Sequence, residues 1–202
     1  MTKRIDRYLD HITMYRLVLY YLATLVALAF LLGFFAIVPH DPTAIAFSAV
    51  LILAVCWITN RVFARIYDVP ANAESPYITA LILVLILDPI TASDPNGVGV
   101  LVFASVWAMA SKFIFAIARK HVLNPAALGV VLPAFLLDQP ATWWVGGNIE
   151  LLPVVLIGGL LVVRKLQRFD LVVVFILVDL VTVLATTSPS QYGTALSQTL
   201  LS

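Results

Sequence analysis

The feature that most constrains this chain is a series of seven apolar runs, separated by short stretches of charged and turn-forming residues. Hydrophobic residues make up 62% of its 202 residues and charged residues 11%, whereas a soluble domain carries about 25% charged residues. The first run spans about 24 residues, too long for a signal peptide, so we predict a retained span. The runs occupy residues 15–38, 43–64, 76–90, 97–118, 125–138, 150–163 and 170–187. They predict an all-α polytopic membrane protein of about seven transmembrane segments in a single transmembrane domain.

The positive charges gather on one side of this predicted topology. All 12 Lys and Arg residues fall in four regions, which seven crossings place on the same side. The groups are Lys3, Arg4, Arg7 and Arg16; Arg61 and Arg65; Lys112, Arg119 and Lys120; and Arg164, Lys165 and Arg168. Cytoplasmic loops carry an excess of Lys and Arg, so we expect a cytoplasmic N-terminus and an external C-terminus. We therefore expect the lipid bilayer to be a partner of this chain, and we expect no binding to nucleic acid.

Two of the runs are too short to cross a membrane in a straight line. Residues 76–90 and 125–138 provide about 14 or 15 residues each, whereas a straight crossing needs about 20. In both, a predicted N-cap residue precedes a proline that starts the helix, as Ser75-Pro76 and as Asn124-Pro125. Paired short helices interrupted by proline indicate a binding site in a polytopic protein. Their free N–H groups and positive dipole ends favour an anionic or electron-rich ligand.

The candidate binding side chains lie at or near these two helix openings. They are Ser75, Thr79, Lys112, Lys120, His121 and Asn124. Another interpretation remains open for the basic residues. They could serve as anchors at the membrane interface, with the aliphatic part of each lysine side chain in the apolar region and its ammonium group in the interface. Thr79 and Ser105, both inside apolar runs, are expected to bond back to their own helix backbone.

Acidic residues in the apolar runs are the second group of candidates. Asp179 lies near the middle of the last run, where it suits either an ion or proton relay or a neutral acid bonded to a neighbouring helix. Asp88 and Asp138 follow the two short runs. Either a turn or a cation site would explain them, and we favour the turn, while Asp88 stays a candidate for ion coupling with Asp179.

The remaining motifs indicate packing rather than catalysis. The single Cys56 offers no disulfide or paired metal motif and is expected to pack as a small hydrophobe. Gly129 and Gly158-Gly159 would permit close helix packing. The sixth segment is also short, and the flanking Trp143, Trp144 and Arg164 could extend it as anchors at the membrane interface. No catalytic, metal or nucleotide-binding signature of soluble enzymes is present, so any chemistry would be carried by a cofactor.

Three stretches resemble one family of membrane proteins. They are ESPYITALILVLILDP at 74–89, SKFIFAIARKHVLNPAALGVVL at 111–132, and WWVGG with LLPVVLIGGLLVVRKLQRFD between 143 and 170. They are similar to the NqrB/RnfD family, membrane components of sodium-pumping NADH:quinone reductase and of the Rnf electron-transport complex, over most of residues 45–187. The resemblance implies two inverted five-helix repeats with broken helices, a flavin within the membrane region, and electron transfer coupled to Na⁺ or H⁺ movement.

The resemblance also implies an arrangement of this chain. Residues 1–138 would form the complete first repeat, and 139–202 a partial second repeat that is shortened at the C-terminus. The family's S-G-A-T motif for covalent FMN has no counterpart here, so FMN or riboflavin would bind noncovalently near residues 75–79 and 121–125. The chain would be a subunit of an ion-translocating oxidoreductase in a prokaryotic inner membrane. Its partners would be other membrane and flavoprotein subunits, or a second copy of itself that completes the missing half.

Two other functions fit the same sequence. A secondary transporter or channel-like protein could hold an anionic solute at the two helix openings. A membrane anchor could instead dock a soluble reductase through its basic loops.

Overall fold

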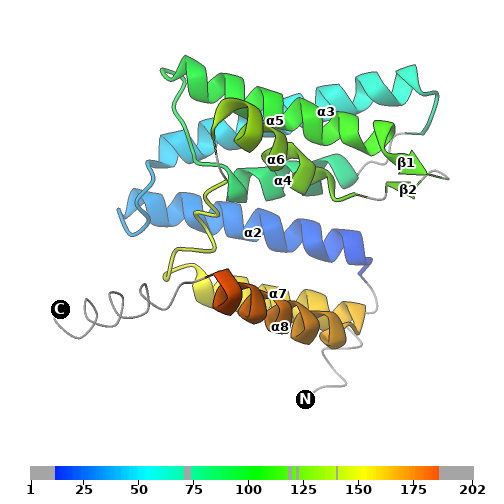
Figure 1. The fold of residues 1–202 in the computed structure, drawn as a ribbon. Coiled ribbons are helices and arrows are strands. Elements are labelled where there is room, and N and C mark those ends of the chain that lie inside the picture. Colours follow the sequence, from blue (N-terminus) through cyan, green and yellow to red (C-terminus); the bar gives the residue numbers. More distant parts are fainter. Residues whose placement is uncertain (1–11, 71–73, 118–119, 122, 140, 187–202) are drawn as a thin grey trace. The chain divides into compact units, whose positions relative to one another are not determined.

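The computed structural model describes residues 12–70, 74–117, 120–121, 123–139 and 141–186. Within these residues the chain forms seven helices and one short hairpin (Figure 1). The helices are α2 (Met14–Phe34), α3 (Pro42–Ile66), α4 (Ser75–Ile86), α5 (Pro95–Ile114), α6 (Pro125–Leu137), α7 (Leu152–Leu166) and α8 (Phe169–Thr186). Each predicted run is confirmed as a helix, with bounds that differ by a few residues.

Three of the helices are long and apolar enough to cross a membrane. These are α2 with 21 residues, α3 with 25 and α5 with 20. Helices α4 and α6 are apolar but shorter, with 12 and 13 residues. The structure therefore supports a membrane protein and confirms that the third and fifth runs are half-length helices.

The long helices start where a polar side chain can accept a backbone N–H. Asp41 caps α3 through its carboxylate, which accepts the N–H and the hydroxyl of Thr43 at 2.7 and 2.6 Å. Both bonds lower the pKa of the Asp41 carboxyl below its ordinary value, and the bond from the Thr43 hydroxyl has the larger effect. Asp94 caps α5 by accepting the N–H of Gly97 at 3.0 Å. Both caps precede a proline, whose missing N–H costs nothing in the first helical turn.

Three predicted helix ends lie four residues beyond the observed ones, among them that of α4, which ends at Ile86 rather than at 90. Helix α5 ends at Ile114 rather than near 118, and β1 (Ala116–Ile117) then pairs with β2 (Lys120–His121) in antiparallel register. A chain that turns back on itself at this point cannot continue the helix. Helix α2 ends at Phe34 rather than 38, because the backbone reverses at Ala36, whose φ is 52°.

Helices α2 to α6 alternate in direction, so their polar ends form two groups (Figure 1). At one end the start of α2 meets the start of α4, where Arg16 Nε lies 3.1 Å from Glu74 Oε1. Aromatic contact between Phe63 and Phe113 joins the ends of α3 and α5 there, with ring centroids 5.7 Å apart. We call this the basic end, after its cationic residues Arg16, Arg61, Arg65 and Lys112.

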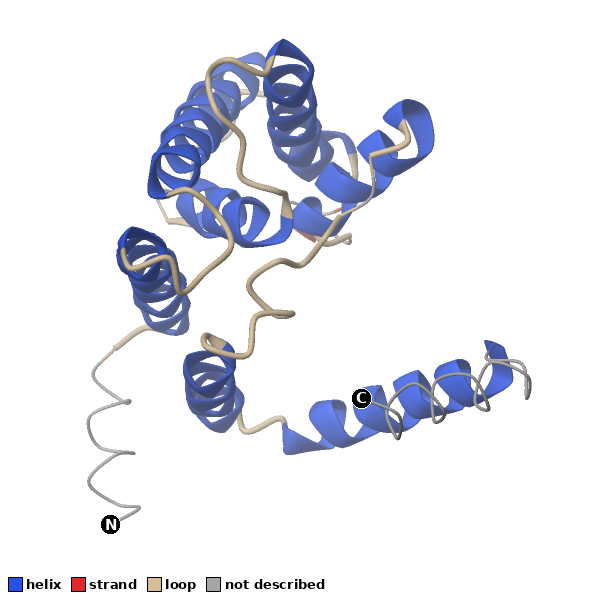
Figure 2. Ribbon diagram, turned by 90° about the vertical axis from the view of Figure 1, so that its left-hand side faces the viewer, coloured by secondary structure: helices blue, strands red, loops and turns tan. Residues whose placement is uncertain are grey.

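The opposite end holds the loops that precede α3, α5 and α7, and Figure 2 views the helices from this side. Ser48 ties α3 to the loop after α4, because its hydroxyl oxygen accepts the N–H of Ile90 at 2.9 Å. His40 Nε2 lies 3.7 Å from Asp88 Oδ1. The separation of charge that the sequence predicted is therefore present within this group of helices.

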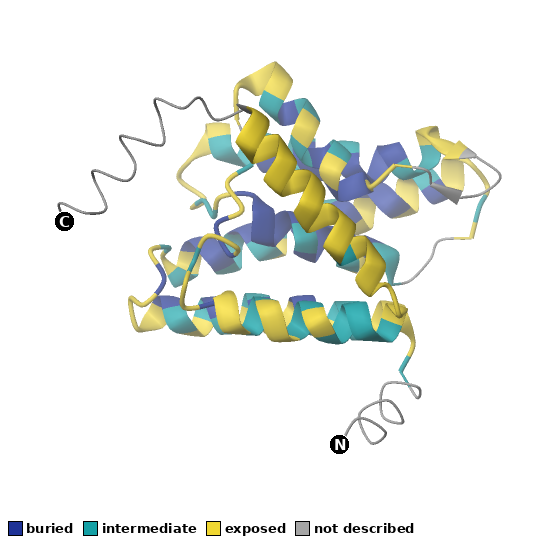
Figure 3. Cartoon of the chain, turned by 60° about the horizontal axis from the view of Figure 1, so that its bottom comes forward, coloured by how far each residue is buried: buried dark blue, intermediate teal, exposed yellow. Residues whose placement is uncertain are grey.

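Helix α4 lies at the centre of the core. Most of its residues are buried, among them Ala80 and Leu83 at 0% exposure, and it packs against α2, α3, α5 and α6. Figure 3 shows the buried residues gathered on the inward faces of these helices. Cys56 is also fully buried, which confirms its expected role as a small packed side chain. A half-length helix thus occupies the most enclosed position in this part of the fold.

The chain divides into two compact units, Met1–Gly159 and Leu160–Ser202. The first contains α2 to α6 and the beginning of α7. The second contains the end of α7 and the whole of α8, joined by a turn at Gln167, whose φ is 54°. Within it, Arg168 Nη1 lies 3.8 Å from Asp170 Oδ2 in the first turn of α8.

Two adjacent glycines of α7 provide the first prediction. An ideal Cβ on Gly158 would overlap the Tyr21 ring, whereas one on Gly159 would meet nothing within 4 Å. The Tyr21 hydroxyl also donates to the carbonyl of Val155 at 3.0 Å. We expect Gly158→Val to lower the free energy of unfolding by about 1–2 kcal/mol, because the ring must move and overpacking costs this much. Thermal unfolding followed by circular dichroism in detergent would measure it.

Gly159→Val is the matched control, since it adds the same side chain one residue away. It should leave the unfolding midpoint nearly unchanged. Equal effects of the two substitutions would contradict the close contact between α7 and Tyr21.

Candidate functional site

The start of α4 is the first element of the candidate site. The helix has 12 residues, about 18 Å of rise, against a hydrocarbon core of about 30 Å. Its N-cap is Glu74, which makes no side-chain cap bond, and Ser75 is already the first helical residue. The predicted role of Ser75 as the N-cap is therefore wrong. Its side chain is engaged elsewhere, and the Glu74 carbonyl accepts the N–H of Ile78 in helical fashion.

Lys112 reaches this helix start from the last turn of α5. Its Nζ donates to the Ser75 carbonyl at 3.1 Å and to the Ser75 hydroxyl at 3.0 Å. The buried Thr79 donates its hydroxyl to the same carbonyl at 3.1 Å, which confirms the back-bond expected for it. Three predicted residues from two helices, Ser75, Thr79 and Lys112, are thus brought together. Lys112 bonds inward to α4, so these contacts are not those of a simple interfacial anchor.

The electrostatics of this contact are unusual. A helix N-terminus carries a partial positive charge, so an ammonium group beside it is repelled. Lys112 is half-buried and makes no ion pair with any carboxylate among the described residues. Glu74, which directly precedes Ser75 in the sequence, is paired with Arg16. The start of α4 therefore concentrates positive charge, which favours an anionic ligand.

The start of α6 differs from that of α4. Asn124 is the N-cap, as predicted, and its side-chain oxygen accepts the N–H groups of Ala126 at 3.0 Å and Ala127 at 3.4 Å. Those donors are already used within the protein. Lys120 and His121 form β2, which leads toward this helix, but their side chains lie outside the described part of the chain. Of the two openings, the start of α4 is the one without a side-chain cap.

The far end of α4 is completed by the loop after α6. The Trp144 indole donates to the Val84 carbonyl at 2.9 Å, and the N–H groups of Thr142 and Trp143 donate to the Ile86 carbonyl at 3.2 and 3.1 Å. Trp144 is 7% exposed, so its predicted role as an interfacial anchor is wrong, whereas Trp143 is 59% exposed. The Trp144 indole lies inside the fold because it donates a hydrogen bond to the buried end of α4.

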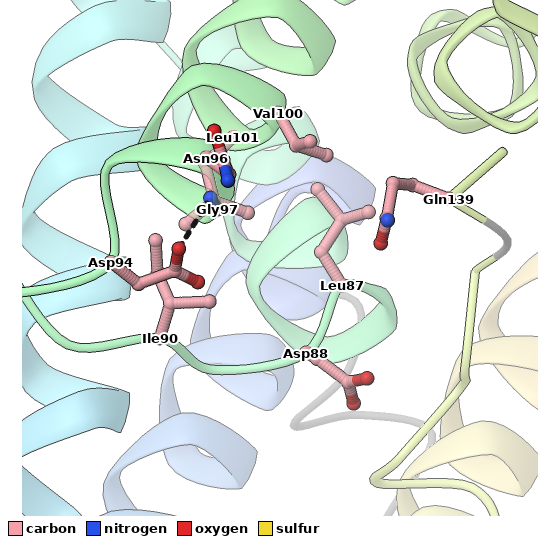
Figure 4. A pocket seen from close by; sticks show the side chains of 9 residues that line it. All are labelled: Leu87, Asp88, Ile90, Asp94, Asn96, Gly97, Val100, Leu101 and Gln139. Atoms are coloured by element: carbon pink, nitrogen blue, oxygen red, sulfur yellow. Dashed lines mark hydrogen bonds between the residues drawn. The ribbon is translucent and has the colours of Figure 1, made fainter. Parts of the chain in front are cut away.

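Asp88 lies beside this capped end. Its carboxylate accepts the Thr142 hydroxyl at 2.8 Å and faces His40. It also borders a pocket of about 290 Å³ (Figure 4). The pocket is lined by Leu87, Asp88, Ile90, Asp94, Asn96, Gly97, Val100, Leu101 and Gln139. In the described part of the chain no three His, Cys, Asp or Glu side chains group as metal ligands, and ion coupling by Asp88 stays a prediction.

The other polar candidates belong to other elements. Asp138 is the left-handed C-cap of α6, with φ 52°, which confirms the predicted turn. Asp179 lies near the middle of α8 in the second unit, and its role as a relay or a neutral acid stays a prediction. Ser105 departs from expectation, because its buried hydroxyl has no hydrogen-bond partner in the described structure.

Sequence reasoning missed two residues beside the start of α4. Arg16 was considered only as one of the positive charges, and Glu74 was not considered as a helix cap. Glu74 directly before Ser75-Pro76 was an available signal, because acids favour helix starts. Comparison with known proteins finds no matching family model, no matching curated protein and no matching solved structure.

Proposed function

We propose that the chain is a flavin-binding membrane subunit of a respiratory electron-transport complex, of the kind formed by sodium-pumping NADH:quinone reductase and Rnf. It would hold FMN or riboflavin noncovalently and pass electrons between flavins, with coupled Na⁺ or H⁺ movement. The partner subunits and the prokaryotic inner membrane belong to this proposal, for which the sequence resemblance is the support.

The observation that carries the proposal is the pair of hydrogen bonds from Lys112 Nζ to Ser75. They hold a half-buried cation at the start of a half-length helix that has no side-chain cap. A flavin suits this environment, because its ring gains negative charge on reduction and FMN carries a phosphate. Lys112 and the first N–H groups of α4 would bind and orient the anionic part, and the flavin would supply the electron-transfer chemistry.

Topology forms the second part of the proposal. We infer that all seven described helices cross or enter the membrane, with the basic end on the cytoplasmic side. The positions of Arg16, Arg61, Arg65 and Lys112 at one end of α2 to α5 support this orientation. The flavin would then lie toward the cytoplasm, within reach of a soluble electron donor.

The experiment is the flavin content of purified protein, measured from its visible absorption spectrum. We expect Lys112→Gln to weaken flavin binding by about tenfold or more, because hydrogen bonds to charged groups contribute about 1.5–3 kcal/mol, and the loss is read as flavin content over a series of flavin concentrations. Lys165→Gln, the same substitution at the end of α7, is the control and should retain flavin. Circular dichroism would establish that both variants are folded.

Three results would change the proposal. Full flavin content in folded Lys112→Gln would place the site elsewhere. A colourless wild-type protein that still binds an anionic solute would favour the transporter. Flavin fluorescence that persists on the protein band after denaturing electrophoresis would contradict noncovalent binding.

A further inference from the structure

One face of α3 points outward along the whole second half of the helix. Its exposed residues recur at intervals of three and four, which places them on one stripe. In chain order they are Val50, Ala54, Trp57, Ile58, Arg61, Val62, Arg65 and Ile66. The stripe is apolar for its first part, carries an indole next, and ends with two guanidinium groups near the basic end. This order of side chains matches the profile of one lipid leaflet, from hydrocarbon to headgroup.

The two arginines line a pocket at the end of this stripe. It measures about 320 Å³ and is lined by Arg61, Ala64, Arg65, Asp68 and Val69. The Arg61 guanidinium lies over the Trp57 ring, 4.6 Å from its centroid. This contact holds the guanidinium in place, since cations are attracted to the face of an aromatic ring.

The end of α3 fixes the other side of the pocket. Asp68 adopts a left-handed conformation with φ 49°, its N–H bonds to the Arg65 carbonyl at 3.3 Å, and the Val69 N–H bonds to the Ala64 carbonyl at 3.0 Å. This is the pattern of a Schellman motif, which ends a helix with a defined turn. Asp68 and Val69 are therefore set at fixed positions beside the arginines.

The pocket carries a net positive charge. Two guanidinium groups face one carboxylate, and neither arginine forms an ion pair with an acid among the described residues. Arginine binds phosphate in a planar, two-pronged geometry. A phosphate diester with one negative charge therefore complements the pocket in both charge and shape.

We propose that this pocket binds the phosphodiester headgroup of an anionic phospholipid, with the acyl chains lying along the apolar part of the α3 stripe. The rise from Val50 to Arg61 is about 16 Å, close to half the hydrocarbon thickness of about 30 Å. A lipid whose phosphate meets Arg61 and Arg65 would therefore reach Val50 near the membrane centre. A free phosphate shares the headgroup chemistry but makes no use of the exposed side chains at 54, 58 and 62. The site is independent of the proposed flavin site.

The test is a titration of the purified full chain in detergent with phosphatidylglycerol, with bound lipid counted by native mass spectrometry. The double variant Arg61→Gln with Arg65→Gln should weaken binding on the order of thirtyfold, because each basic residue near an anionic lipid contributes about 1 kcal/mol. Asp68→Asn should strengthen it about fivefold by removing the negative charge. Arg168→Gln, at the turn before α8, is the control and should have no effect.

Two further arms distinguish the sources of the phosphate group. Glycerol phosphate should bind far more weakly than phosphatidylglycerol, and phosphatidylcholine, which has no net charge, should bind more weakly as well. Equal affinity for glycerol phosphate would make the pocket a site for free phosphates and overturn the proposal. Unchanged lipid affinity in the folded double variant, or a weaker affinity after Asp68→Asn, would also overturn it.

Discussion

Replacing Trp144 with alanine is expected to lower the free energy of unfolding by about 3–5 kcal/mol, the cost of removing a large buried aromatic side chain. The indole is 7% exposed and packs in the core cluster with Leu81 and Leu85 of α4. It also donates the hydrogen bond that satisfies the Val84 carbonyl. Both losses affect the end of α4, so this helix should open before the others. Thermal unfolding followed by circular dichroism would measure the loss of stability. Amide hydrogen exchange would show whether α4 is the helix that opens first.

Two variants separate the contributions of Trp144. Trp144→Phe keeps most of the ring and removes the N–H, so it should cost about 1–3 kcal/mol, the penalty of an unsatisfied buried acceptor. Trp143→Ala is the matched control, because that side chain is 59% exposed, and it should change stability by less than about 0.5 kcal/mol. A larger effect at Trp143 than at Trp144 would show that the indole does not cap α4.

Replacing Gly129 with valine should destabilise the fold by about 3 kcal/mol, at the upper end of the usual range for overpacking. An ideal Cβ at this position of α6 would lie 2.8 Å from the Ala108 Cβ and 3.0 Å from the Ala104 carbonyl oxygen. Neither atom can rotate away, because one is a methyl group fixed to α5 and the other is α5 backbone. The two helices would have to separate. Unfolding in detergent with increasing SDS would measure the loss.

Gly99→Val provides the control for the substitution in α6. Gly99 lies in α5, and an added Cβ would meet nothing within 4 Å. We expect its unfolding midpoint to stay close to that of the unmodified chain. Tolerance of Gly129→Val at the same level would mean that α5 and α6 are not in close contact.

The two half-length helices show which features could be predicted from the sequence and which could not. Ser75-Pro76 and Asn124-Pro125 look alike as local signals, and both do start helices. Only Asn124 acts as the cap, because its partners are its own next neighbours. Ser75 instead meets Lys112, which lies 37 residues away along the chain. A contact over that separation depends on how α4 and α5 pack and leaves no local pattern.

The adjacent tryptophans show the same limit. Composition predicts membrane-interface positions for both Trp143 and Trp144, since indoles are enriched there. The structure separates them, because the turn at Trp143, whose φ is 49°, sends one ring outward and the next into the core. The pairing of β1 (Ala116–Ile117) with β2 (Lys120–His121) was missed for a related reason. Its strands have only two residues each, too few for an alternating pattern to appear.

The dependence of α4 on later parts of the chain also bears on its synthesis. The group at its start is Lys112, and the donors at its end are Thr142, Trp143 and Trp144. All of them follow α4 in sequence, so they are made after it. When α4 has just been synthesised, the carbonyls of Val84 and Ile86 lack these donors. More than fifty further residues must be added to the chain before the donors exist. Such groups cost several kcal/mol in lipid. Helix α4 therefore gains its full set of partners only after α6 and the loop that follows it have been made, although it is the third apolar segment to be synthesised.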